Sequence, residues 1–95
     1  MLLMPVQPLQ EESSDTAISL GEPAKVILFN DEIHTFDEVI NQILKAIKCT
    51  RERAEQLTWE VHSRGKAAVF EGLMEECLKV SGILEEIGLH TQVEC

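Results

Sequence analysis

The sequence predicts an α+β fold in which three helices lie on one face of a small three-stranded antiparallel sheet. Three observations carry this prediction: a short run of strand-forming apolar residues, two helical stretches that begin at capping threonines, and an alternating apolar pattern at the C-terminus. The expected order of elements is β-α-α-β-α-β. A chain of 95 residues has room for one small domain, which we place at residues 24–95.

The predicted domain opens with a strand and a helix. The run Val26–Phe29 consists of strand-forming apolar residues and is stopped by Asn30-Asp31, as expected of a buried strand. Thr35 followed by Glu38 is a capping box, in which each side chain accepts a hydrogen bond from the backbone N–H of the other residue. Apolar residues at helical spacing over residues 36–47 then predict the first helix.

A second helix and a second strand are expected next. Thr50 is a suitable N-terminal cap for the helix, and Gly65 suits the left-handed conformation at which many helices end. Lys66–Phe70 has the composition of a strand, and Glu71-Gly72 is typical of a turn. The helix, the strand and the turn together fill residues 50–72.

The C-terminal part is expected to contain a third helix and a last strand. The helix spans Leu73–Ile87 and is stopped by Gly88. Its apolar face carries Leu73, Cys77, Val80, Leu84 and Ile87. Residues 89–95 alternate between apolar and polar side chains, which predicts a half-buried strand.

Composition and charge exclude several classes of protein. The net charge is −9, from 17 acidic against 8 basic residues, and no basic stripe exists that could neutralise the phosphates of a nucleic acid. Cys49, Cys77 and Cys95 are odd in number, far apart and without a secretory signal, so we expect free thiols. Residues 1–10 lack the basic start of a signal peptide and are broken by prolines. We therefore expect a cytoplasmic protein that binds neither nucleic acid nor membrane.

The first 23 residues differ in character from the rest. They contain all three prolines, several acidic side chains and no Lys or Arg. Such a segment buries too little apolar surface to offset its ordering entropy. We predict a flexible acidic N-terminal extension over residues 1–23.

Two polar clusters are candidates for function. The loop after the first strand carries Asn30, Asp31, Glu32 and His34, and polar groups on a loop held by rigid elements are candidates for binding. His62 lies near the end of the second helix. The simpler alternatives are that the loop only solvates a turn and caps a helix, and that His62 is an ordinary surface histidine at a helix C-terminus.

The same residues give weak support to catalysis or to metal binding. Asp31 and His62 suggest a dyad, but Ser63 follows His62 directly, and neighbours on a helix point in different directions. A metal site formed by Asp31, Glu32, His34 and His62 lacks any recognised ligand spacing. We expect neither an enzyme nor a metal site.

Two blocks of sequence resemble one protein family. Residues 25–32 (Lys-Val-Ile-Leu-Phe-Asn-Asp-Glu), followed by Thr35-Phe36, resemble the opening of the ClpS adaptors of Clp proteases. Arg53–Leu57 and Val61–Ala67 resemble the second block of that family. The resemblance covers residues 24–95. It implies a monomeric, non-enzymatic adaptor without a cofactor, which delivers substrates to an AAA+ unfoldase of the ClpA or ClpC kind for ATP-dependent proteolysis.

The resemblance also assigns roles to individual residues. The positions that match the residues around the free α-amino group of the substrate are Asn30, Asp31 and His62. Those that match contacts to the following peptide backbone are Glu32 and His34. The first side chain, which is Leu, Phe, Tyr or Trp in the family, enters an apolar pocket matched here by Phe36, Val39, Thr58, Val61 and Leu89. Glu75 matches a position on the face that docks on the unfoldase, and the N-terminal extension matches the segment that engages it.

The chain departs from the family pattern at the loop and in the pocket. Glu32 stands where many members have a second Asp, and His34-Thr35-Phe36 where many have Thr-Pro-Met. Thr58 occupies a position that is often Met, and a smaller side chain there is expected to widen the pocket and admit β-branched first residues. The leading alternative function is an interaction domain of the same fold, which docks on a chaperone or another protein without recognising N-termini. In that case the apolar residues are simply core, and Glu75 is a solvated acid.

Overall fold

The computed structural model describes residues 20–95 and confirms the predicted fold class. Its elements are β1 (Pro23–Phe29), α2 (Phe36–Ile47), α3 (Arg51–Arg64), β2 (Lys66–Leu73), α4 (Met74–Glu85) and β3 (Thr91–Glu94). The predicted N-terminal extension lies outside the described residues as far as residue 19. Its character therefore stays a prediction. Within residues 20–95, no helix has the length and apolar character needed to cross a membrane.

The central strand of the sheet is β1, which pairs antiparallel with β2 on one side and β3 on the other. It begins at Pro23, earlier than the predicted run, and its register with β2 shifts between Val26 and Ile27. The side chains of Val26 and Leu28 are fully buried. The middle of β1 is therefore part of the core, and its end carries the chain straight into the loop at residue 30.

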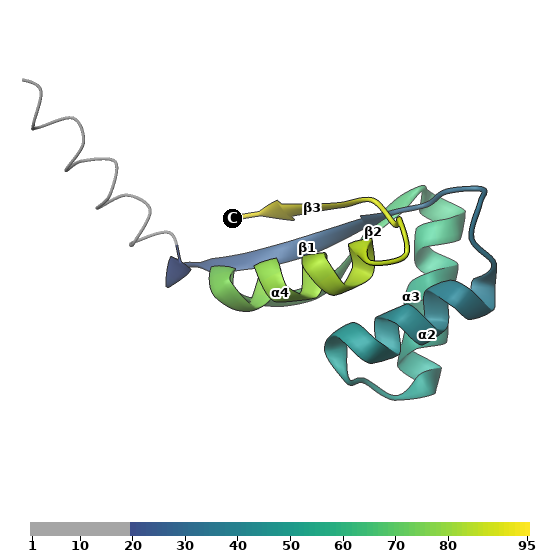
Figure 1. Cartoon of the computed structure of the whole chain (residues 1–95), viewed down its shortest axis with the longest axis horizontal. Coiled ribbons are helices and arrows are strands. Elements are labelled where there is room, and N and C mark those ends of the chain that lie inside the picture. The colour runs from purple at the N-terminus through teal and green to yellow at the C-terminus, as the bar shows by residue number, and fades with distance from the viewer. Residues whose placement is uncertain (1–19) are drawn as a thin grey trace, which may run out of the picture.

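The three helices cover the sheet unequally. In Figure 1, α4 lies along the sheet, while α2 and α3 gather at the end where β1 leaves for the loop. α4 contacts all three strands, α3 contacts β2, and α2 packs on α3 and α4. The largest fully buried side chains come from both groups of elements: Leu28, Ile43, Leu57, Leu84, Val26 and Cys77. Burial of one such side chain stabilises the folded state by about 1.5–3 kcal/mol. The shared core therefore fixes α2 and α3 relative to the sheet.

The predicted helix starts are confirmed in atomic detail. The Thr35 hydroxyl accepts a hydrogen bond from the N–H of Glu38 at 3.2 Å, and the Glu38 carboxylate accepts one from the N–H of Thr35 at 2.8 Å. The Thr50 hydroxyl accepts from the N–H of Arg53 at 3.1 Å. Gly65, at φ 89°, ends α3 in the left-handed conformation. Of these capping residues, only Thr35 lines the pocket described below.

The turn predicted at Glu71-Gly72 is wrong. β2 continues to Leu73 because the early start of β1 offers it partners, with Gly72 opposite Ala24. A Cβ at Gly72 would lie 2.7 Å from Glu76 Oε1 and 2.9 Å from a ring carbon of Phe70, so a larger residue there would displace these side chains. The same Glu76 oxygen accepts from the N–H of Leu73 at 3.0 Å, and α4 begins at the next residue.

The third helix is shorter than predicted. It spans Met74–Glu85, and Leu73 and Ile87, both expected in the core, are 48% and 37% exposed. The chain turns after residue 85, and Gly88 adopts φ 92°. Leu89 is buried, and β3 begins only at Thr91. The connection over residues 86–90 thus passes beside the site loop.

The cysteines are free, as predicted. Cys77 is fully buried on the inner face of α4. The half-buried Cys49 lies in the connection between α2 and α3. Cys95 is exposed.

Candidate functional site

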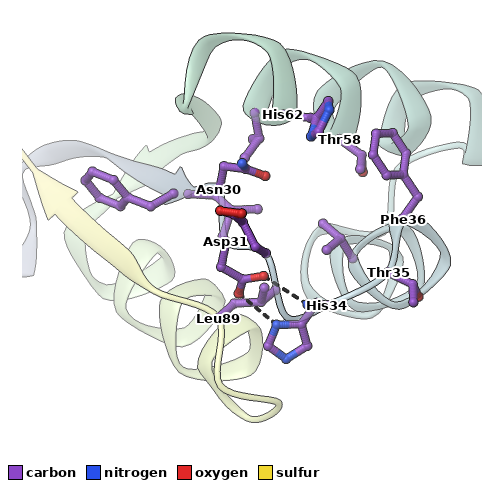
Figure 2. Close-up of a pocket in the computed structure, with 13 residues that line it drawn as sticks. Asn30, Asp31, His34, Thr35, Phe36, Thr58, His62 and Leu89 are labelled. Carbon is purple, nitrogen blue, oxygen red and sulfur yellow. Dashed lines mark hydrogen bonds and ion pairs between the residues drawn. The ribbon is translucent and has the colours of Figure 1, made fainter.

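A pocket of about 370 Å³ lies where the end of β1, the loop after it, α2, α3 and the connection before β3 meet. Figure 2 shows labelled side chains from the loop, from α2, from α3 and from the connection before β3 arranged around one space. Every residue predicted for the α-amino group, for the peptide backbone and for the apolar pocket lines it, together with Leu28, Phe29 and Thr35. The structure thus brings together residues 30–39, 58–62 and 89, which lie far apart in the sequence.

The inner part of the pocket is apolar. Thr58, Val61 and Leu89 are each at least 95% buried, and Phe36 and Val39 are half-buried. The Thr58 hydroxyl donates to the carbonyl of Ala54 at 2.8 Å, one turn earlier in α3. Because the hydroxyl proton of Thr58 is bonded within the helix, Thr58 leaves no unsatisfied donor in the pocket lining.

An aromatic cluster forms one edge of the pocket. The Phe36 ring packs edge-on against Trp59, with 4.7 Å between the ring centroids, and against His62, with 5.2 Å. Trp59 is 59% exposed and lies outside the lining. These contacts fasten the start of α2 to the last turns of α3.

Asp31 organises the polar loop. Its Oδ1 accepts hydrogen bonds from the N–H groups of Ile33 and His34, both at 3.0 Å, which is an Asx turn. Its Oδ2 lies 2.7 Å from Nδ1 of His34. Burial alone would raise the pKa of Asp31, but the hydrogen bonds from His34 and Ile33 lower it below its usual value. Asp31 is therefore a carboxylate at neutral pH.

The histidine beside Asp31 is His34, and not His62 as the suggested dyad required. Nε2 of His34 lies 2.5 Å from the backbone carbonyl oxygen of Ile87. The hydrogen bond to Asp31 and then that to the Ile87 carbonyl raise the pKa of His34. His62 is exposed, and within residues 20–95 its ring makes no hydrogen bond. One histidine of the pocket is bonded on both sides, and the other is open to a ligand.

This arrangement suits a cation next to an apolar group. The Asp31 carboxylate, the Asn30 amide and the His62 ring stand around the entrance to an apolar pocket. Among residues 20–95, no group of three or more His, Cys, Asp and Glu residues is placed to hold a metal ion. The Ser63 hydroxyl donates to the carbonyl of Trp59 at 2.8 Å on the surface of α3. Its proton is therefore directed to the backbone and not to the His62 ring.

Some lining residues were not predicted. Leu28 and Phe29 belong to the run that was interpreted only as a buried strand, although the last side chains of a strand next to a functional loop are natural lining residues. Thr35 was interpreted only as a helix cap. Glu75 lies apart from the pocket, exposed in the first turn of α4. The N–H of the preceding Met74 donates to the carbonyl of Glu22 at 2.7 Å, so Glu75 is near the point where the N-terminal segment enters β1.

Comparison with known proteins gives relatives for most of the chain. Residues 21–91 match the model of the family described as ATP-dependent Clp protease adaptor protein ClpS. The ClpS adapter of Thermosynechococcus vestitus is 42% identical over 53 residues, which are 55% of this chain and 56% of the adapter. The E3 ubiquitin-protein ligase UBR1 of Drosophila melanogaster is 37% identical over 59 residues, which are 62% of this chain and 3% of the ligase. UBR2 of Homo sapiens is 33% identical over 58 residues, again 3% of that protein. The chain therefore matches about half the length of the adapter and a small part of the ligases.

A solved structure shares the fold. It is Agrobacterium tumefaciens ClpS2 bound to L-phenylalaninamide, with a TM-score of 0.73. The match covers 78% of this chain and 96% of that chain at 16% sequence identity. At this identity the likeness concerns the fold alone.

Proposed function

The chain belongs to the ClpS family of Clp protease adaptors, and we propose that it selects substrates by a free α-amino group and a bulky apolar first side chain. It is an adaptor and not an enzyme. The observation that supports this proposal most is the pocket itself, an apolar cavity of about 370 Å³ with a carboxylate, an amide and an open imidazole at its entrance. The residues assigned to the amino group are Asn30, Asp31 and His62.

The chemistry of an N-terminus fits these three groups. An α-ammonium has three N–H donors, and a carbonyl, a carboxylate and an imidazole nitrogen are all acceptors. Hydrogen bonds between charged partners are about twice as strong as neutral ones. Acetylation removes both the charge and the donors, so an acetylated N-terminus is expected to be rejected.

The apolar part of the pocket fits the first side chain. Its lining residues Phe36, Val39, Thr58, Val61 and Leu89 offer a mostly dry surface. Burial of a Leu or Phe side chain there gives roughly 1.5–3 kcal/mol. The ligand of the Agrobacterium tumefaciens relative, L-phenylalaninamide, has the same two features, a free α-amino group and an apolar side chain. We include Leu, Phe, Tyr and Trp in the proposed set of first residues.

Delivery completes the proposal. The partner is a Clp-type AAA+ unfoldase, contacted through the N-terminal extension and through Glu75. Support comes from the position of Glu75 beside the start of β1, where that extension joins the domain. The peptide backbone behind the first residue lies against Glu32 and the side of the His34 ring, because both ring nitrogens of His34 are bonded within the protein. The proposed adaptor acts as a monomer in the cytoplasm, without a cofactor.

Peptide binding tests this function directly. Fluorescence anisotropy is measured with labelled peptides that differ only at residue one (Leu, Phe, Tyr, Trp, Ile or Met), each with a free or an acetylated α-amino group. We expect micromolar or tighter binding of the bulky set, lost on acetylation and in Asp31→Ala. Weak binding to every peptide, without regard to acetylation, would overturn the proposal and favour an interaction domain that docks without recognising N-termini.

A further inference from the structure

His34 occupies an unusual position between two acceptors. Nδ1 lies 2.7 Å from the Asp31 carboxylate, and Nε2 lies 2.5 Å from the carbonyl oxygen of Ile87, 53 residues later in the chain. Figure 2 shows the ring at the edge of the pocket, joined to Asp31. The His34 side chain is only 12% exposed. A hydrogen bond to the connection before β3 is not needed for an Asx turn or for a helix cap, so it calls for a separate explanation.

The two acceptors determine which form of the ring fits. A neutral imidazole has one N–H donor and one acceptor nitrogen, whereas an imidazolium has two donors. Neither a carboxylate nor a carbonyl oxygen can donate. Only the imidazolium satisfies both contacts, and the neutral ring leaves a lone pair facing the Ile87 carbonyl or the Asp31 carboxylate.

The bridge also determines how much of Asp31 remains for a ligand. A carboxylate offers about four acceptor positions. Oδ1 accepts two backbone N–H groups, and Oδ2 accepts His34 Nδ1. One position on Oδ2 is left for an incoming N–H donor, in an orientation fixed by three hydrogen bonds.

We propose that His34, as an imidazolium bridging Asp31 and the Ile87 carbonyl, is a positioning residue for peptide binding. It joins the loop that holds the α-amino group to the connection that carries Leu89, a wall of the apolar pocket. The distance between the amino-group site and the pocket is thereby fixed before the peptide arrives, which reduces the entropy lost on binding. This inference rests on the proposed function of the same pocket.

The charges around the ring favour the bridge. The charges that act on the ring are Asp31 in the loop and Glu38 in α2. At the end of α4, the Lys45–Glu86 ion pair involves the residue that precedes Ile87. Asp31 and Glu38 both raise the pKa of His34. Lys45 is paired with Glu86 at 2.9 Å, so its charge is largely offset. The Glu85 carboxylate accepts a hydrogen bond from the Thr91 hydroxyl, with 2.6 Å between the oxygens.

The sign of the pH dependence follows from that raised pKa. A group whose pKa is higher in the folded state contributes fully below its unfolded value, about 6.5 for histidine, and loses its contribution as pH rises through the folded value. Asp31, with a lowered pKa, stays charged throughout this range. The positioning effect should therefore be present at pH 6 and disappear when His34 loses its proton.

Two measurements on the 95-residue chain test the role of His34. NMR of the histidine rings in the ligand-free protein gives the midpoint of the His34 titration. The affinity of a Phe-first peptide is then measured one pH unit below and one above this midpoint, for the wild type and His34→Gln, which does not titrate. At each pH, the affinity of the wild type is divided by that of His34→Gln. This ratio cancels the titration of the peptide's own α-amino group, which is the same for both proteins. His90→Gln is the matched control, because His90 is exposed and lies outside the pocket lining.

We expect wild type to bind about 10-fold more tightly than His34→Gln below the midpoint, and the ratio to fall to about 2-fold or less above it. His90→Gln should follow wild type at both values. A His34 ring that is neutral at pH 6, or an affinity ratio that is the same on both sides of the midpoint, overturns the role of His34 while peptide binding itself stands. If no peptide binds wild type at either pH, the proposed function and this role fall together.

Discussion

Two walls of the pocket use their polar groups in opposite ways. In the loop wall, residues 30–35, Asp31 and His34 are bonded to each other and to the backbone. The helix wall consists of Thr58, Val61 and His62 on α3. Its Thr58 hydroxyl donates to a carbonyl of the same helix, and the His62 ring packs on Phe36 and Trp59 without a hydrogen bond to any described residue. The two walls therefore have different roles in the proposed binding of a peptide. The loop wall is prearranged around the Asp31 carboxylate, and the helix wall supplies apolar surface and one open acceptor.

The charge of the loop wall should have the largest effect on binding. Asp31→Asn keeps an oxygen for the backbone N–H groups but removes the charge. A hydrogen bond to a charged group is worth about 1.5–3 kcal/mol, so we expect free-amino peptides to bind about 10- to 100-fold more weakly. Anisotropy titrations give the affinity, and Asp37→Asn, an exposed acid in the first turn of α2, is the control. Equal losses in the two variants would mean that only the net charge of the protein matters.

The open acceptor of the helix wall should matter less. His62→Phe preserves a ring against Phe36 but cannot accept a hydrogen bond, and a neutral hydrogen bond contributes about 0.5–1.5 kcal/mol. We expect binding about 2- to 10-fold weaker, with a melting temperature close to that of the wild type because His62 is exposed. Isothermal titration calorimetry measures the affinity, and thermal unfolding measures the melting temperature. A loss as large as that of Asp31→Asn would reverse the proposed ranking of the walls.

The apolar part of the helix wall should set selectivity. Thr58 is almost fully buried and lines the pocket. Thr58→Met fills space beside the first side chain, so we expect the preference for N-terminal Leu over Ile to rise about 5-fold, less than one pocket methylene can give in discrimination. Thr58→Val is the control, since it has a similar shape and lacks only the hydroxyl that bonds Ala54. Identical Leu and Ile preferences in the wild type and Thr58→Met would remove Thr58 as a determinant of selectivity.

The features that could be predicted from the sequence are those decided by residues close together in the chain. The helix caps at Thr35 and Thr50 were correct because a cap is decided within four residues. Glu71-Gly72 was interpreted as a turn because the pattern of a turn is also local, but the outcome was decided by the distant start of β1, which pairs with these residues. Ile87 was assigned to the core by helical periodicity, although the helix had already ended two residues before it.

The polar site shows the same limit more sharply. The residues lining the pocket were gathered from a family resemblance, since strand and helix periodicity alone would assign Val39 and Val61 to the core. The bridge from Asp31 through His34 to Ile87 could not have been predicted, because it depends on a carbonyl 53 residues away. No side-chain pattern marks a backbone carbonyl. A loop whose acid and histidine are three residues apart could signal an Asp–His pair, but not its second contact.

The two helix caps offer the smallest and most closely matched test of the loop wall. Thr35 and Thr50 each cap a helix through the same kind of hydrogen bond, at 3.2 and 3.1 Å. Thr35 also lines the pocket, while Thr50 does not. Replacement of either by Ala should lower the free energy of unfolding by about 1 kcal/mol, as measured in urea. Only Thr35→Ala should also weaken peptide binding, by about 2-fold, because it loosens the start of α2 where the loop wall ends. If both variants weaken binding equally, the effect comes from general stability, and the loop wall owes its order to Asp31 and His34 alone.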